Sequence, residues 1–144
     1  MQLYKTLELR PSQLEKIYMD LGGQYSFWER LRRKRVGSPM MFYDSGSEQL
    51  DQLQILATDE LRINFELLKE GILIRIAERT TSYFIPIRKK EILTIELTKD
   101  DIKTYLTLTT SSSLVVYLWG GIDHYYGWKD LIKNSFLMGF IDKL

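Results

Sequence analysis

The most distinctive chemistry in the sequence is a run of cations in segment 30–35, where five of six residues are Arg or Lys. Groups of this kind bind the anionic oxygens of lipid headgroups, protein carboxylates or nucleic-acid phosphates. At helical spacing, Phe27 and Trp28 lie opposite most of these cations, as in a helix that rests on a membrane surface. A functional interpretation therefore gives an anionic partner to Arg30, Arg32, Arg33, Lys34 and Arg35.

A solvated helix face is the more economical interpretation of the same cations. Arg side chains can extend along a packed helix while their charged ends stay in water, and Glu29 is spaced to pair with Arg33 across one turn. The run is also short for a nucleic-acid site, and no known nucleic-acid-binding module accompanies it. Among the functional interpretations, a protein or an anionic lipid surface therefore ranks above nucleic acid.

A second concentration of chemistry surrounds Gly120-Gly121, where aromatic residues are dense. Rings beside a glycine pair can line a ligand or peptide groove, because aromatic anchors dominate recognition energies. Packing of a helix onto the sheet explains the same rings and is the preferred interpretation, since the chain must turn here. The aromatic concentration also includes Tyr117, and the candidate patch consists of Trp119, His124, Tyr125, Tyr126 and Trp128.

Catalytic and metal chemistry find little support in the sequence. His124 is the only histidine and the chain has no cysteine, which excludes thiolate metal sites and a Cys nucleophile and leaves little scope for a His-based site. Asp123 next to His124 does not make a catalytic pair, because neighbours on an extended chain point to opposite sides. No nucleophile elbow or phosphate-binding glycine loop is present. The sequence predicts no catalytic residue, no metal and no cofactor.

The length of the chain indicates one domain, and its net charge indicates no strong overall electrostatic field. The 144 residues carry 20 Lys and Arg against 19 Asp and Glu, a net charge of +1, so any electrostatic function must be local. The longest apolar stretch, residues 114–122, is far shorter than the roughly 20 residues of a membrane span. We expect a cytoplasmic protein, and the oligomeric state stays open.

Helical periodicity marks the first third of the chain. Apolar residues recur at helical spacing over 14–21, between a Ser12–Glu15 pair spaced as a capping box and the breaker Gly22-Gly23. A second helix is expected from about Ser26, carrying Phe27, Trp28 and Leu31. Residues 37–49 then read as a loop around a short strand at 40–43.

Strict alternation of apolar and polar residues replaces this period after about residue 52 and predicts antiparallel strands. Pro86 lies inside one such run, which places that strand at an edge, a bulge or a corner. Six or seven strands are expected: 61–67, 72–76, 83–87, 93–97, 105–109 and 114–119, with 53–57 as a further candidate.

The period changes again after Gly120-Gly121 and predicts a C-terminal amphipathic helix of about four turns, starting between residues 123 and 129. Its apolar face consists of Trp128, Leu131, Ile132, Phe136 and Phe140. A helix with one apolar face must bury that face against another element. We expect it to close one end of a strongly bent sheet or small barrel.

The succession of strands 71–76, 83–87 (ending Ile85-Pro86-Ile87) and 91–97, followed by a terminal helix, resembles a bacterial pleckstrin-homology-like barrel over residues 50–144. The resemblance implies a β-barrel-like core with a C-terminal helix at 50–144. With the helical N-terminal element at 1–49, which lies outside the resemblance, we expect an α+β fold in a single domain. The resemblance also implies a non-enzymatic binding or scaffolding module. An enzyme or small-molecule carrier using the barrel interior and a nucleic-acid-binding accessory protein are the alternatives.

Overall fold

The fold is α+β and is built on one nine-stranded sheet. The computed structural model describes residues 2–26, 29–30 and 36–143. The strands are β1 (Tyr4–Lys5), β2 (Met41–Ser45), β3 (Arg62–Leu68), β4 (Gly71–Glu78), β5 (Thr81–Arg88), β6 (Ile92–Lys99), β7 (Lys103–Thr110), β8 (Val115–Gly121) and β9 (Ile141–Lys143). Their order across the sheet is β1-β5-β4-β3-β2-β8-β7-β6-β9, and every pairing is antiparallel except that of β6 with β9.

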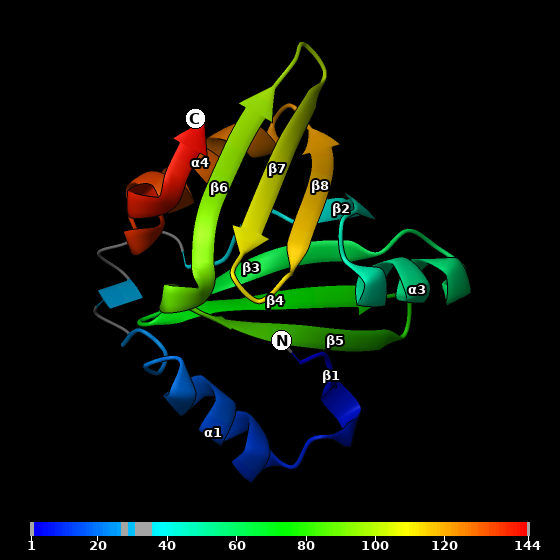
Figure 1. Ribbon diagram of the computed structural model, residues 1–144, viewed down its shortest axis with the longest axis vertical. Helices are drawn as coiled ribbons and strands as arrows, with labels where there is room; N and C mark the ends of the chain where they lie inside the picture. The colour runs from blue at the N-terminus through cyan, green and yellow to red at the C-terminus, as the bar shows by residue number, and fades with distance from the viewer. Residues whose placement is uncertain (1, 27–28, 31–35, 144) are drawn as a thin grey trace.

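Two runs of consecutive strands meet at β2, which pairs with β3 on one side and with β8 on the other. Figure 1 shows β3, β4 and β5 crossing the direction of β6, β7 and β8, so the sheet is strongly bent. The expected strand count of six or seven was too low for the whole sheet. The short edge strands β1 and β9 have only two and three residues, too few to show an alternation.

The inner face of the bent sheet holds the main core. Alternate residues of β3 to β8 are buried, including Ile63, Phe65, Ile74 and Leu106 at no more than 1% exposure. This confirms the prediction that residues 61–98 are mainly strand. Pro86 lies on a stretch of β5 that has β4 on one side only, because β1 pairs just with Tyr83 and Phe84.

Helix α4 (His124–Lys133) starts where the sequence predicts and packs onto this core. The buried ring of Trp128 meets Phe65 edge-on at 5.0 Å between centroids. The expected length of four turns is wrong, because Asn134 caps the helix and Ser135 adopts extended backbone angles. The chain then forms a separate 3-10 helix, Phe136–Phe140, whose first turn is capped by the Ser135 hydroxyl.

Helix α1 (Pro11–Asp20) confirms the first predicted helix and covers the outer side of the other half of the sheet. Its residues pack with Tyr4 and Leu9 on a small second cluster around Leu73 and Phe84, which point outward from β4 and β5. The predicted Ser12–Glu15 capping box is wrong. Arg10 is the N-cap and Pro11 opens the helix, two residues earlier than that box requires, and the Arg10 N–H donates to Gln13 Oε1 at 2.8 Å.

Helix α3 (Glu48–Leu56) occupies the stretch where a strand at 53–57 was a candidate, so that candidate is wrong. Ser47 caps its start, and the Tyr43 hydroxyl donates to Asp51 in its first turn at 2.5 Å. Burial, with this hydrogen bond, raises the pKa of Tyr43 well above its ordinary value. Because Leu50 is the one buried residue of α3, the Ser47 cap and the Tyr43–Asp51 hydrogen bond are the contacts that hold the start of the helix in place.

The described part of the first 49 residues includes strands as well as helix. These residues contribute β1 and β2 to the sheet, and β2 confirms the predicted short strand near 40–43. Of the second predicted helix, Glu29 and Arg30 are helical, whereas Phe27, Trp28 and Leu31 lie outside the described residues.

Candidate functional site

The outer face of β2, β8 and β7 carries a group of exposed aromatic residues. Side chains alternate along each strand, so Tyr117 and Trp119 share the outer side of β8, and Tyr105 lies on the outer side of β7. Tyr105 and Tyr117 are 38% and 45% exposed. Helix α4 packs on the opposite, inner side of these strands, where Trp128 and Leu131 join the core, and Figure 1 shows it passing behind β6 and β7. Large aromatic residues left on a sheet face are candidates for an interaction site.

Register brings these residues together across three strands. Trp119 is opposite Phe42 on β2 and opposite Tyr105 on β7. The rings of Phe42 and Trp119 lie 4.8 Å apart at 34°, and the Lys103 ammonium lies 4.9 Å from the centre of the Trp119 ring. Residues on both neighbouring strands therefore hold Trp119 in place. Because its ring is already ordered, binding a partner loses little side-chain conformational entropy at this residue.

A groove of about 270 Å³ runs over this face. Two charged side chains line it, both exposed: Asp44 from β2 and Lys103 from β7. They carry opposite charges on opposite sides of β8. We call this site the aromatic groove, and its lining residues are Asp44, Lys103, Tyr105, Leu106, Thr107, Tyr117, Leu118 and Trp119.

The β6–β7 turn fixes one wall of the aromatic groove. Asp100 accepts hydrogen bonds from the backbone N–H groups of Ile102 and Lys103 at 2.9 and 2.7 Å, which lowers its pKa. The Tyr105 hydroxyl donates to the same carboxylate at 3.0 Å, and this raises the pKa of Tyr105. The ring of Tyr105 is thus oriented by a carboxylate that the turn itself holds.

The patch expected around Gly120-Gly121 is divided by the structure. Trp119 joins the aromatic groove, whereas Trp128 and Tyr125, at 0% and 7% exposure, belong to the core. Tyr126 is exposed and packs edge-on against Tyr125, with the Lys99 ammonium 4.7 and 5.3 Å from the two rings. These contacts fit the packing interpretation for Tyr125 and Trp128.

His124 lies half-buried beneath Gly120 at the start of α4. A methyl group on Gly120 would come within 2.6 Å of the imidazole Nδ1, so only glycine allows this approach. Within the described residues, that nitrogen has no hydrogen-bond partner and no group of three metal-ligating side chains is found.

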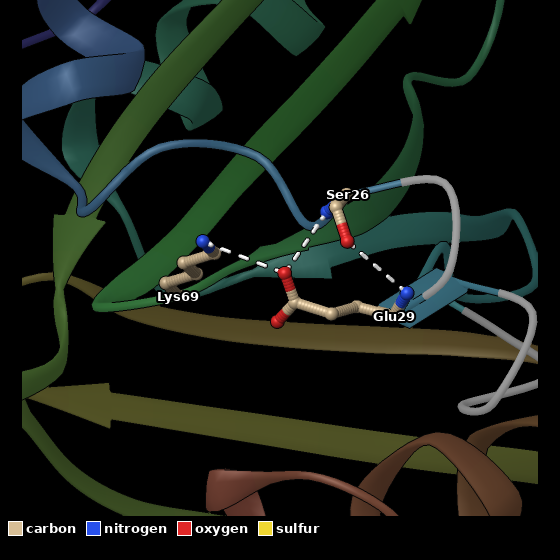
Figure 2. A network of polar contacts seen from close by, with 3 residues as sticks. All are labelled: Ser26, Glu29 and Lys69. Atoms are coloured by element: carbon tan, nitrogen blue, oxygen red, sulfur yellow. Dashed lines mark hydrogen bonds and ion pairs between the residues drawn. The ribbon is translucent and has the colours of Figure 1, made fainter.

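Of the basic cluster, the structure describes Arg30, which is exposed; Arg32, Arg33, Lys34 and Arg35 lie outside the described residues. An anionic partner for this cluster stays a prediction from the sequence. The start of the segment is anchored by the network in Figure 2. The Ser26 N–H donates to Glu29 Oε1 and the Glu29 N–H to the Ser26 hydroxyl, both at 3.2 Å, and Lys69 lies 3.5 Å from the Glu29 carboxylate.

We expect the pKa of Glu29 to lie below its ordinary 4.5, because Ser26 first and Lys69 second stabilise the carboxylate. The contribution of Glu29 to stability is therefore present at neutral pH and is lost as the pH falls through the folded-state pKa. Carboxyl chemical shifts followed through a pH titration measure the value. Ser26→Ala keeps the backbone N–H that contributes most, so the pKa of Glu29 should stay below its ordinary value in that variant. An unshifted pKa in the parent protein would contradict the network.

The site residues that the sequence did not predict are Phe42, Asp44, Lys103 and Tyr105. The available signal was the alternation in β7 and β8, which puts Tyr105 and Tyr117 on the side of each strand opposite its buried apolar residues. What was missing is the pairing of β2 with β8, since Phe42 and Trp119 are far apart in the chain and adjacent in the sheet.

Comparison with models of protein families, with curated proteins and with solved structures gave no match to this chain. None of the helices in the described residues is long and apolar enough to cross a membrane.

Proposed function

We propose that this chain is a non-enzymatic binding or scaffolding module that engages a partner protein through the aromatic groove. The observation that carries the proposal is the set of Tyr105, Tyr117 and Trp119 on the sheet's outer face, around a groove of about 270 Å³. Tyr and Trp are the residue types that most often anchor protein interfaces, and exposed groups of them mark interaction sites.

The filled interior of the sheet favours this proposal over a carrier or an enzyme that uses a pocket inside the barrel. Inner positions of the strands, such as Ile74, Ile85 and Leu108, are apolar and fully buried. Trp128 and Leu131 of α4 fill the space against them. A ligand on the outer face needs no opening of this core.

The resemblance to pleckstrin-homology-like barrels is consistent with the same proposal. Strands β4, β5 and β6 follow one another as the resemblance expects, with Ile85-Pro86 in β5, and α4 packs its apolar face onto the core. We propose on this basis that the bent sheet is a barrel of this kind. Fold alone does not name a ligand, so the argument for binding depends on the groove.

Site-specific photo-crosslinking tests the proposal in cells that produce the protein. A photoreactive phenylalanine at Tyr117 should give a discrete protein adduct after illumination. The same residue at Tyr126, a tyrosine outside the groove that is more exposed than Tyr117, is the control and should not give that adduct. Absence of an adduct at Tyr117, or the same adducts at both positions, would contradict a protein-binding groove.

A further inference from the structure

The aromatic groove has the chemistry of a surface that can bind itself. We infer that its occupant is a second copy of this chain, so that two copies pair face to face over β2, β8 and β7. This inference depends on the proposed function, because it takes the groove to be a protein-binding site and names the protein.

The first argument is the placement of charge. Asp44 on β2 and Lys103 on β7 flank β8 from opposite sides, and they are the two charged residues among the described groups that line the groove. In an interface between two identical copies, residue i of one meets residue j of the other, and j meets i. A surface that carries one anion and one cation on opposite sides can therefore satisfy both charges with its own copy.

The strand order permits this pairing geometrically. Asp44 is level with Tyr117 and Leu118 of β8, and Lys103 is opposite Gly121. A twofold axis that lies between two facing sheets and crosses β8 obliquely near Trp119 would therefore place Asp44 of each copy against Lys103 of the other. Tyr117 and Trp119 lie on either side of Leu118 on β8, so their rings would fall inside the interface. The charged pair would then form twice at the margin of an aromatic centre, which is the usual arrangement of a protein interface.

Composition and net charge favour a copy of the chain over a strongly charged partner. The groove combines one Asp and one Lys with three exposed or half-exposed rings, whereas an acidic or basic partner would need a surface with one dominant charge. The whole chain carries +1, so two copies repel each other only weakly. Homodimer interfaces are also more apolar than other surfaces, with aromatic residues enriched.

Charge exchange at the two positions tests the inference in purified protein by sedimentation velocity over a range of concentrations. The parent chain should form a dimer. Asp44→Lys leaves two cations on the groove and Lys103→Asp leaves two carboxylates, so each variant alone should dimerise at least tenfold more weakly. An equimolar mixture of the two should recover dimer, because both unlike pairs form again between different copies.

Two controls separate this result from general effects of charge or folding. Lys133→Asp changes an exposed cation on α4 away from the groove and should leave the dimer unchanged. The double variant Asp44→Lys with Lys103→Asp should dimerise like the parent. Both altered side chains are exposed, and melting curves establish that each variant is folded.

The inference is overturned by a parent chain that stays monomeric at all concentrations, by variants that dimerise as tightly as the parent, or by a mixture that recovers no dimer. Its failure can be told apart from failure of the proposed function. A monomeric chain that still gives an adduct at Tyr117 with a different protein removes the second copy as occupant and keeps the groove as a protein-binding site.

Discussion

Replacing Trp128 by alanine should lower the free energy of unfolding by about 3–5 kcal/mol, the usual cost of truncating a fully buried large aromatic residue. Trp128 is 0% exposed and its ring packs edge-on against Phe65 in the centre of the core. The change leaves a cavity under α4 that the β-strands around it cannot close. Since small domains are stable by about 5–15 kcal/mol in total, a large fraction of the stability should be lost, as measured by urea unfolding.

Tyr126→Ala on the same helix is the matched control for this prediction. Tyr126 is 59% exposed and contacts mainly Tyr125 and Lys99, so its loss should cost about 1 kcal/mol or less. Trp128→Phe keeps a ring in the core and should fall between the two. Similar small effects of Trp128→Ala and Tyr126→Ala would show that α4 is not docked as described.

Gly46→Ala should destabilise the protein by at least about 2 kcal/mol, because two costs coincide at this position. The backbone there has φ +117°, a conformation that residues with a side chain rarely adopt. A methyl group would also lie 2.4 Å from the Val115 carbonyl oxygen and 3.0 Å from the Tyr117 ring. The chain between β2 and α3 must then shift away from β8, and urea unfolding of the variant measures the loss.

Gly139→Ala provides the comparison, since a methyl group at Gly139 meets nothing within 4 Å. It should be neutral or slightly stabilising, through the smaller freedom of the unfolded chain. If Gly46→Ala proved equally harmless, the close approach of residue 46 to β8 would be wrong. The new methyl group at residue 46 would touch the Tyr117 ring. The nuclear magnetic resonance shifts of that ring should therefore change in Gly46→Ala and not in Gly139→Ala.

Periodicity predicted the elements that have a regular pattern and a one-sided environment. The alternation in β3, β6, β7 and β8 follows from one buried face on each strand. On β4 and β5 the burial is less regular, because α1 packs its apolar side on their outer face. Residues 53–57 were ambiguous because Ile55 and Leu56 are apolar but 80% and 82% exposed in α3. The end of α4 was missed because Phe136 and Phe140 continue the apolar spacing through a local break at Ser135.

The site was predicted only in part because it depends on which strands are neighbours. Trp119 was predicted from the density of aromatic residues around it, but the groove also needs residues from β2 and β7. Aromatic density around Gly120-Gly121 indicated a feature without separating its two sides. Trp119 and Trp128 are nine residues apart in the sequence. Trp119 lies on the outer face of the sheet, whereas Trp128 is buried in the core.

The pairing of β2 with β8 has a consequence for how the chain folds. Strands β3, β4 and β5 pair with their immediate neighbours in sequence, and so do β6, β7 and β8. The contact of Phe42 with Trp119 instead joins residues separated by about half of the chain. Closing such a long loop is entropically costly and slows folding. We therefore expect the two meanders to assemble early and the aromatic groove, which needs both β2 and β8, to form in the last step of folding.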